Sequence, residues 1–125
     1  MMPSFRSKLE EMVATLLGKD WEYEPFKIKY TTKHTYTPDF VHDTGTGEIL
    51  VEVKGFFREG DTQKYKAIRD TLEGTDQHLV FFLSSPFKKV RKGAMLNMGQ
   101  WCDKEGFPWF VDGVDLKEYA DNVDI

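Results

Sequence analysis

The sequence predicts an α/β domain with a central mixed β-sheet flanked by helices. Apolar residues recur at helical spacing over Ser4–Leu17, and Gly18 is expected to end that helix. The continuous apolar run 49–51 indicates a strand buried on both faces, and Leu79–Leu83 is a second buried strand. The predicted order is helix, three strands, helix, strand, helix, strand, which is typical of an α/β fold.

Three strands are expected before the second helix. Phe26–Tyr30 alternates between apolar and polar residues, as a half-buried strand does. A connection over 31–34 leads to a strand over Thr35–His42, in which Pro38 lacks an N–H and should lie at an edge, a bulge or a strand start. The third strand contains the run 49–54 and should end at the glycine that follows it.

The second half of the chain supplies two helices and two strands. A helix is predicted over Thr62–Leu72, before the strand Leu79–Leu83. Met98–Glu105 is predicted as a short helix that Gly106 ends, and Phe107–Val111 as the last strand. The inward residues expected on the longer helix are Tyr65, Ile68 and Leu72.

Length and composition predict one folded domain over residues 1–125. The chain is 40% hydrophobic, which excludes a disordered protein, and its apolar runs are too short to span a bilayer. The N-terminus lacks a basic segment followed by an apolar one, so we expect no secretory signal. Cys102 is the only cysteine, which excludes an internal disulfide and a cysteine-rich zinc site. These features indicate a cytoplasmic protein.

The formal net charge of −4 argues against a simple nucleic-acid binder, but the negative charge is concentrated near the C-terminus. Residues 112–125 hold five acidic residues against Lys117, which leaves residues 1–111 with no net charge. Phosphate affinity depends more on local Lys and Arg placement than on the total. We interpret the acidic segment as a solvated helix end; the alternative is that it discourages non-specific binding.

Asp39 and Glu52 are the most informative pair in the chain. The turn-rich stretch 43–48 lies between them, and a hairpin folded about Gly45 and Thr46 places the two carboxylates opposite each other. Directly opposed residues have Cβ atoms about 5 Å apart, where like charges are destabilising. A divalent cation between them would remove that cost, because hard cations take oxygen ligands. Lys54 lies two residues after Glu52 and therefore projects from the same face.

Two carboxylates and an ammonium on one face form the core of a metal-dependent nuclease. A metal held by Asp39 and Glu52 would neutralise a phosphodiester and lower the pKa of a bound water. Lys54 would orient the attacking water or stabilise charge on the phosphorus oxygens. The alternative is a surface hairpin in which Lys54 neutralises both carboxylates. The apolar run around Glu52 favours the metal site, because a buried unpaired carboxylate is costly.

Glu10 is the candidate for a further carboxylate that a second metal would need. It lies at the margin of the apolar stripe of the first helix. Ser7 and Glu10 also fit a capping box, and Arg6 at i−4 can form an ion pair worth about 0.2–0.5 kcal/mol. Spacing alone leaves both interpretations of Glu10 open.

Two basic clusters are candidates for contacts with DNA phosphates. One lies on the predicted helix 62–72 and the other in a basic loop over 84–97. Charge runs are usually solvated surface, but each cluster follows an element expected beside the active strand. The candidate residues are Lys64, Lys66, Arg69, Lys88, Lys89, Arg91 and Lys92.

Three blocks of the sequence carry a family resemblance: Phe5-Arg6-Ser7-x-Leu9-Glu10, His34-Thr35-Tyr36-Thr37-Pro38-Asp39-Phe40 and Val51-Glu52-Val53-Lys54-Gly55. Together they resemble the bacteriophage endonuclease I family of Holliday-junction resolvases. The likeness covers residues 5–118. Many nucleases of the restriction-enzyme-like superfamily share the Pro-Asp…Glu-x-Lys pattern, whereas the first two blocks are more specific.

The resemblance implies a restriction-endonuclease-like core and cleavage of branched double-stranded DNA that leaves 5′-phosphate ends. It implies one or two Mg²⁺ or Mn²⁺ ions per active site. Glu10, Asp39 and Glu52 would be metal ligands, and Lys54 would be the catalytic lysine. It also implies a homodimer that is domain-swapped through the connection near 30–35, with Glu10 supplied by the partner subunit.

Two departures from the family pattern leave alternatives open. The connection 30–34 is shorter than the family's bridge between subunits, so a hairpin closed within one chain would give a different dimer or a monomer. The basic tail expected in the family is replaced by an acidic one. The other functions to be weighed are a related nuclease that nicks or cuts duplex DNA, of the transposase-subunit or repair type, and a non-catalytic DNA-binding module.

Overall fold

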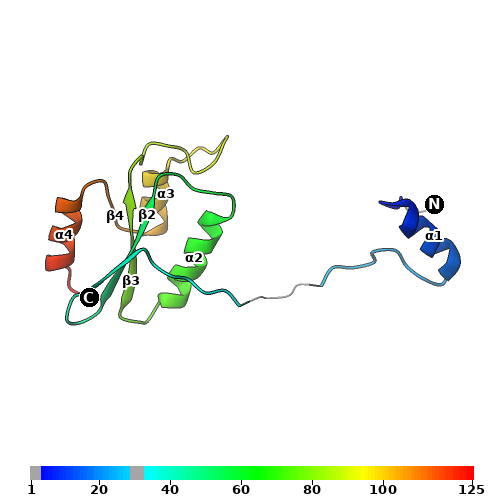
Figure 1. Ribbon diagram of the computed structural model, residues 1–125, viewed down its shortest axis with the longest axis horizontal. Helices are drawn as coiled ribbons and strands as arrows, with labels where there is room; N and C mark the ends of the chain where they lie inside the picture. Colours follow the sequence, from blue (N-terminus) through cyan, green and yellow to red (C-terminus); the bar gives the residue numbers. More distant parts are fainter. Residues whose placement is uncertain (1–3, 29–32) are drawn as a thin grey trace. The chain divides into compact units, whose positions relative to one another are not determined.

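A four-stranded mixed sheet forms the centre of the unit Thr35–Ile125 in the computed structural model, which describes residues 4–28 and 33–125 (Figure 1). The antiparallel pair β1–β2 joins the parallel pairs β2–β3 and β3–β4. The predicted α/β fold with a mixed sheet is thus confirmed, and it is consistent with a restriction-endonuclease-like core. The strands are β1 (Phe40–Asp43), β2 (Glu48–Lys54), β3 (Gln77–Leu83) and β4 (Trp109–Phe110).

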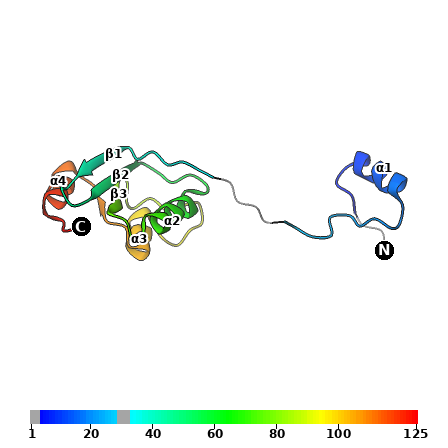
Figure 2. The ribbon, with the colours of Figure 1, turned by 90° about the horizontal axis from the view of Figure 1, so that it is seen from below.

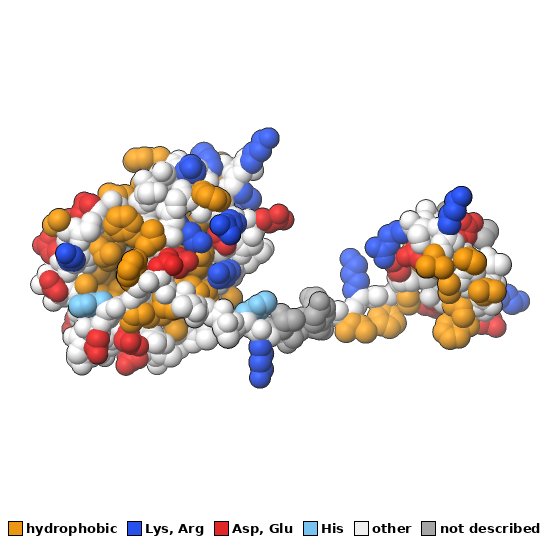
Figure 3. Space-filling view, in the orientation of Figure 1, with side chains coloured by type: hydrophobic (Ala, Val, Ile, Leu, Met, Phe, Trp, Pro, Cys, Tyr) orange, Lys and Arg blue, Asp and Glu red, His pale blue; other side chains and the backbone are white. Residues whose placement is uncertain are grey.

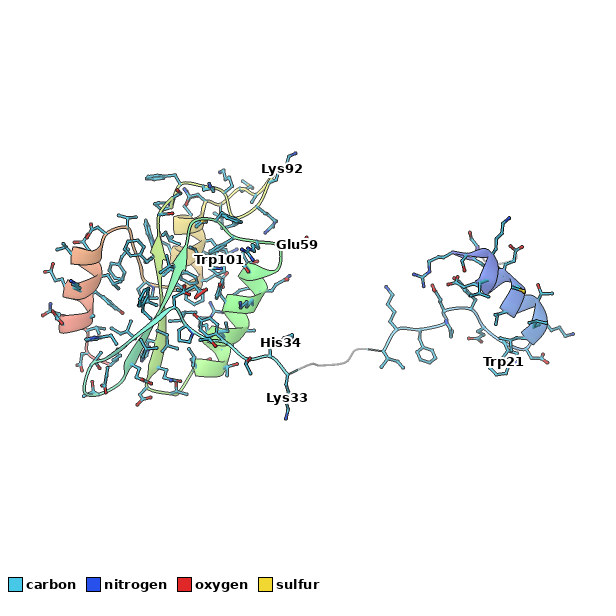
Figure 4. All side chains as sticks on the ribbon, viewed as in Figure 1. Trp21, Lys33, His34, Glu59, Lys92 and Trp101 are labelled. Atoms are coloured by element: carbon cyan, nitrogen blue, oxygen red, sulfur yellow. The ribbon has the colours of Figure 1, made fainter. Side chains whose placement is uncertain are left out.

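Helices cover both faces of this sheet. Helices α2 (Asp61–Leu72) and α3 (Met98–Glu105) lie on one face, and α4 (Gly113–Asn122) lies on the other (Figures 1 and 2). The larger core cluster forms under α2 and α3 and includes Trp101, which is buried inside this unit (Figure 4). A smaller cluster forms under α4.

Alternation along β2 divides its side chains between the two faces of the sheet. Ile49 and Val51 belong to the cluster under α4, whereas Leu50 belongs to the cluster under α2 and α3. All three are buried, which confirms that this strand is covered on both sides. Because side chains two positions apart share a face, Glu52 and Lys54 lie on the α2 side with Leu50.

The β1–β2 hairpin has the register expected from its sequence. Phe40 pairs with Val51 and Asp43 pairs with Glu48, so continuing the ladder places Asp39 opposite Glu52. A Cβ on Gly47 would lie 2.4 Å from the backbone oxygen of Asp76. The hairpin turn is therefore fixed against the segment that leads into β3.

The strand predicted over Thr35–His42 is shorter at its start than expected. Residues 35–39 are outside β1, which begins at Phe40, because Pro38 cannot donate a ladder hydrogen bond. The N–H of Asp39 still donates to the carbonyl of Val51 at 3.0 Å, so the pairing begins one residue before the assigned strand.

The bounds of two helices and one strand agree closely with those predicted. The helix predicted over Thr62–Leu72 begins at Asp61, with Tyr65 fully buried. Helix α3 has the predicted bounds and ends at Gly106, whose φ of 79° is in the left-handed region. The strand predicted from Leu79 begins two residues earlier, at Gln77.

The C-terminal part of the chain differs more from the sequence prediction. The last strand, expected over Phe107–Val111, is reduced to the two residues of β4. The acidic segment that follows is helix α4, which has an apolar face as well as a solvated one. Leu116 and Tyr119 pack on the cluster of Ile49, Val51 and Val80. The expectation of a solvated helix end is therefore only partly right, because this helix also covers the second face of the sheet.

The unit Met1–His34 is built around α1 (Lys8–Leu17). This helix begins at Lys8 rather than Ser4, because the Ser7 side chain is its N-cap and accepts a hydrogen bond from the Glu10 N–H. The strand predicted over Phe26–Tyr30 is wrong for residues 26–28, which are not in a strand, and its last two residues lie outside the described part. The connection expected near 30–35 also lies partly outside the described residues.

Within the described ranges 4–28 and 33–125, no helix has the length and apolar character needed to cross a membrane.

We predict that Gly47→Ala destabilises the protein by about 1–3 kcal/mol, because the added methyl group must displace the Asp76 carbonyl or the hairpin turn. Urea denaturation measures this change. Gly113→Ala is the matched control, because a Cβ at Gly113 meets no atom within 4 Å, and its stability should be unchanged or slightly higher. Equal stability of both variants would show that the turn does not depend on this close approach.

Candidate active site

The carboxylate of Glu52 is buried, and both of its oxygens accept hydrogen bonds. Glu52 is 7% exposed, on the α2 side of β2. The Tyr65 hydroxyl donates to Glu52 Oε1 at 2.8 Å, and the Tyr36 hydroxyl donates to Oε2 at 3.0 Å. Each oxygen of this carboxylate therefore has its own donor, which offsets the cost of removing the charge from water.

The two tyrosines are held in their protonated, donating form. Burial is the main cause that raises the pKa of both Tyr36 and Tyr65, and the charge of Glu52 raises both further. Asp39 also raises the pKa of Tyr36, which indicates that both carboxylates act on this one hydroxyl. The rings of the two tyrosines meet edge to face, with centroids 6.4 Å apart.

Lys54 lies between two buried carboxylates. Its Nζ is 3.7 Å from Glu52 Oε1 and 3.5 Å from Asp61 Oδ2. Asp61, at 8% exposure, is in the first turn of α2, where its Oδ2 also accepts a hydrogen bond from the Arg58 N–H at 2.8 Å. The ammonium is thus fixed on the same face as Glu52, as its spacing in the sequence predicted.

Asp39 lies at the exposed edge of this cluster. Its Oδ2 accepts a hydrogen bond from the backbone N–H of Val53 at 2.8 Å. Its Oδ1 accepts no hydrogen bond from the residues that the structure describes, so this oxygen is open to a ligand. The hairpin register places Asp39 opposite Glu52, next to the strand that carries Lys54.

The donor set of this cluster fits a hard divalent cation. Asp39 and Glu52 present carboxylate oxygens, and an ionised carboxylate has about four lone-pair sites, so Glu52 keeps capacity beyond its tyrosine bonds. Within the described residues, no group of three or more His, Cys, Asp and Glu side chains is arranged to hold a metal. A cation at this site would therefore have two carboxylate ligands from residues 35–125, with water, phosphate or another chain completing its shell.

Glu10 belongs to the unit Met1–His34, whereas Asp39 and Glu52 belong to the unit Thr35–Ile125. Its Oε2 accepts hydrogen bonds from the Tyr23 hydroxyl and from the backbone N–H of Arg6. The bond from Tyr23 is the main cause that lowers the pKa of Glu10. The capping box expected for Ser7 and Glu10 is therefore only half formed: Ser7 accepts from the Glu10 N–H, but the Glu10 carboxylate binds the N–H of Arg6 instead of that of Ser7.

The basic residues of α2 have different surroundings. The Nζ of Lys64 lies over the Tyr65 and Tyr36 rings, at 5.5 and 5.8 Å from their centroids, so it is adjacent to the carboxylate cluster. Arg69 instead donates to the backbone oxygen of Glu105 at 2.6 Å and to its carboxylate at 3.0 Å. Arg69 therefore links α2 to α3, and Lys66 is half-buried on the same helix.

The basic loop 84–97 lacks helix and strand, as predicted, but it is anchored. Val90 is buried in the core, and the Met98 N–H donates to the carbonyl of Lys88 at 2.8 Å. The Nζ of Lys89 donates to the Met95 carbonyl, while Arg91 and Lys92 are exposed, with Lys92 pointing outward at the loop tip (Figure 4). Figure 3 shows Lys and Arg side chains gathered over this loop and the start of α2.

Sequence reasoning missed four residues around this site. Tyr36 lies in the block 34–40 and Tyr65 on the expected inward face of its helix, and the signal for both is that a phenol removed from water needs a hydrogen-bond partner. Asp61 could have been found as an acidic residue at a helix start. Arg58 had no signal in the sequence, because its position depends on the loop between β2 and α2.

We predict that Tyr65→Phe destabilises the protein by roughly 1–3 kcal/mol, because it leaves buried Glu52 Oε1 without its closest donor. Urea denaturation measures the effect. Tyr119→Phe is the matched control, since Tyr119 packs on Phe110 and its hydroxyl makes no hydrogen bond with the described residues. If Tyr119→Phe lowered the free energy of unfolding as much as Tyr65→Phe, the hydrogen bond to Glu52 would not be the cause of the loss.

Comparison with known proteins identifies the family of this chain. A family model described as Phage endonuclease I matches residues 1–122. The chain is 38% identical over 109 residues to Endonuclease I of Escherichia phage T7, covering 82% of this chain and 70% of that protein. It is also 38% identical over 109 residues to Endodeoxyribonuclease 1 of Enterobacteria phage T3, covering 82% of this chain and 68% of that protein. The chain therefore belongs to the phage endonuclease I family, as its sequence blocks predicted.

Proposed function

We propose that this protein is a metal-dependent endodeoxyribonuclease that hydrolyses phosphodiesters in branched DNA, of the Holliday-junction resolvase type. Family membership supports a nuclease, and the phage T3 relative is named as an endodeoxyribonuclease. The observation that carries the proposal for this chain is the cluster on β2. Glu52 and Lys54 lie 3.7 Å apart on one face, and the β1–β2 register brings Asp39 opposite Glu52.

Asp39 and Glu52 would hold a divalent cation, which we propose to be Mg²⁺ or Mn²⁺. Such a cation supplies Lewis-acid chemistry, neutralising the phosphodiester and acidifying water. Tyr36 and Tyr65 keep the Glu52 carboxylate in one orientation, so the ligand is arranged before the cation arrives. Asp39, at the solvent-exposed side, supplies the accessible oxygen.

Lys54 would act on the reacting phosphate as a fixed positive charge. Asp61 and Glu52 hold the ammonium from two sides, so little reorganisation is needed when charge develops on the phosphorus oxygens. The same ammonium can hydrogen-bond the attacking water, since it has three N–H donors. Asp61 thus acts through Lys54 as a positioning residue.

We also propose that the active unit is a homodimer in which Glu10 of the partner subunit joins Asp39 and Glu52 as a metal ligand. The support is the family resemblance and the composition of the N-terminal unit. Helix α1 exposes Leu9, Met12 and Leu16, and an apolar stripe of this kind is suited to pack on a partner. Paired cuts across a four-way junction require two active sites, which a dimer supplies.

The nuclease assignment predicts that the wild-type protein with Mg²⁺ cuts a four-way junction faster than a plain duplex of the same sequence. Glu52→Gln and Lys54→Ala should each reduce the single-turnover rate by at least about 10²-fold, because the first weakens the cation site and the second removes the ammonium that stabilises charge on the phosphorus oxygens. Gel analysis of end-labelled DNA measures both rates. Equal rates on junction and duplex would instead identify a duplex nuclease, and salt-dependent binding without hydrolysis would identify a non-catalytic module.

Cation binding by the carboxylates predicts that Ca²⁺ raises the melting temperature of the protein, because a ligand bound to the native state stabilises it. Asp39→Asn should abolish this rise, and Asp43→Asn on the same hairpin is the control that should retain it. Differential scanning calorimetry with and without Ca²⁺ measures the shift. A rise that persists in Asp39→Asn would place the cation elsewhere.

The dimer predicts complementation between two inactive chains. A mixture of Glu10→Gln and Glu52→Gln chains, unfolded and refolded together, should regain cleavage, because a heterodimer with exchanged N-terminal units contains one intact site. That heterodimer should nick the junction on one strand only. If each site instead takes Glu10 and Glu52 from the same chain, every site carries a defect and the mixture remains inactive.

A further inference from the structure

Phe56 is an exposed aromatic ring with two cations near it. It is 54% exposed, whereas its neighbour Phe57 is 8% exposed and belongs to the core. The guanidinium carbon of Arg58 is 6.0 Å from the Phe56 ring centroid, and the Nζ of Lys88 is 5.9 Å from it. Two segments far apart in the sequence thus bring their charges to one ring.

This group lies directly beside the proposed catalytic residues. Phe56 is two residues after Lys54, the last residue of β2. The N–H of Arg58 donates to Asp61, and the same oxygen of Asp61 lies 3.5 Å from the Lys54 ammonium. Arg58 is therefore connected to Lys54 through one carboxylate.

The backbone that carries the second cation, Lys88, is held in place by the fold. The carbonyl of Lys88 accepts a hydrogen bond from the Met98 N–H at 2.8 Å, at the start of α3. The loop that carries Lys88 contains four Lys and Arg residues and no acidic residue over 84–97. This surface is locally positive although the chain as a whole is negative, so it is complementary to a phosphate backbone.

The exposed Phe56 ring is not part of the hydrophobic core. A cation–π contact at an exposed site is a weak interaction, so the ring gains little stability from the two cations alone. Aromatic side chains beside a positively charged surface are the arrangement that proteins use to stack nucleic-acid bases while binding the adjoining phosphates. The occupant that fits this group is therefore a base with a free face and its flanking phosphates.

We propose that Phe56, Arg58 and Lys88 form a stacking platform for the branch-point base of branched DNA. The proposal rests on the proposed function and adds the basis of its structural selectivity. In a plain duplex each base face is covered by the next base pair, so the Phe56 ring has nothing to stack on. At a branch point a face is uncovered, and the ring covers it while Arg58 and Lys88 contact the phosphates on either side.

The test uses a four-way junction with 2-aminopurine at the branch point and a duplex with the same base in the same sequence. Ca²⁺ replaces Mg²⁺, so binding is measured by fluorescence without relying on hydrolysis. Wild-type protein should quench 2-aminopurine in the junction and leave the duplex signal unchanged. Phe56→Ala should abolish the quenching and weaken junction affinity by about tenfold, while duplex affinity changes by less than about twofold.

Two variants control for folding and for a general effect of exposed rings. Phe56→Tyr keeps the aromatic face and should restore quenching and affinity. Phe87→Ala removes a ring in the basic loop that is 84% exposed and has no cation over it among the described residues, and it should behave as wild type. Circular dichroism of each variant confirms that the fold is retained.

Three results would overturn the proposal. Phe56→Ala could retain full quenching, or it could weaken junction and duplex binding equally. It could also change the sedimentation of the DNA-free protein, which would assign the ring to a contact with a second copy of the chain. These results differ from a failure of the nuclease assignment. In that case the wild-type protein would not hydrolyse DNA with Mg²⁺, but it would still quench 2-aminopurine with Ca²⁺.

Discussion

The structure of the candidate site depends on one buried carboxylate. Glu52 is placed inside the molecule by the alternation of β2, because its strand neighbours must fill the two cores on either side of the sheet. A buried charge without partners would be strongly destabilising. Tyr36, Tyr65 and Lys54 supply those partners, and each comes from a different position along the chain. The partners that make burial of Glu52 possible therefore include Lys54, the lysine that we propose for catalysis.

The same constraint links stability to function. Tyr65 packs its ring in the aromatic core against Phe57 and Phe81, while its hydroxyl reaches Glu52. Lys54 is shared by Glu52 and by Asp61 at the start of α2. Movement of α2 relative to the sheet would disturb both contacts at once. The rigidity of the core thus determines how precisely the carboxylate and the ammonium are held.

The sequence predicted those parts of the site that follow from local periodicity. Lys54 shares a face with Glu52 because of strand alternation, and the hairpin register follows from the position of its turn. Helix α3 was predicted with its exact bounds, because a helical pattern and a terminal glycine lie together in the sequence. The roles of Asp61 and Arg58 could not be predicted in this way, because they depend on how the loop after β2 turns into α2.

Two errors in the predicted elements have a common cause. The alternation in Phe26–Tyr30 predicts a strand, although residues 26–28 are not in a strand of the described part of the chain. The acidic charge of 112–125 obscured the apolar stripe by which α4 covers the sheet. In both segments, the local sequence pattern predicted the structure poorly, because contacts with the rest of the fold decide whether a segment pairs as a strand or packs as a helix.

The most direct test of the central claim is anomalous diffraction from crystals of the protein grown with Mn²⁺. The account predicts an anomalous peak between Asp39 and Glu52, with carboxylate oxygens of both residues about 2.1 Å from it, and with Lys54 beside it. A peak at other residues, or no peak at this position while Glu52 keeps only its tyrosine and lysine partners, would contradict the account.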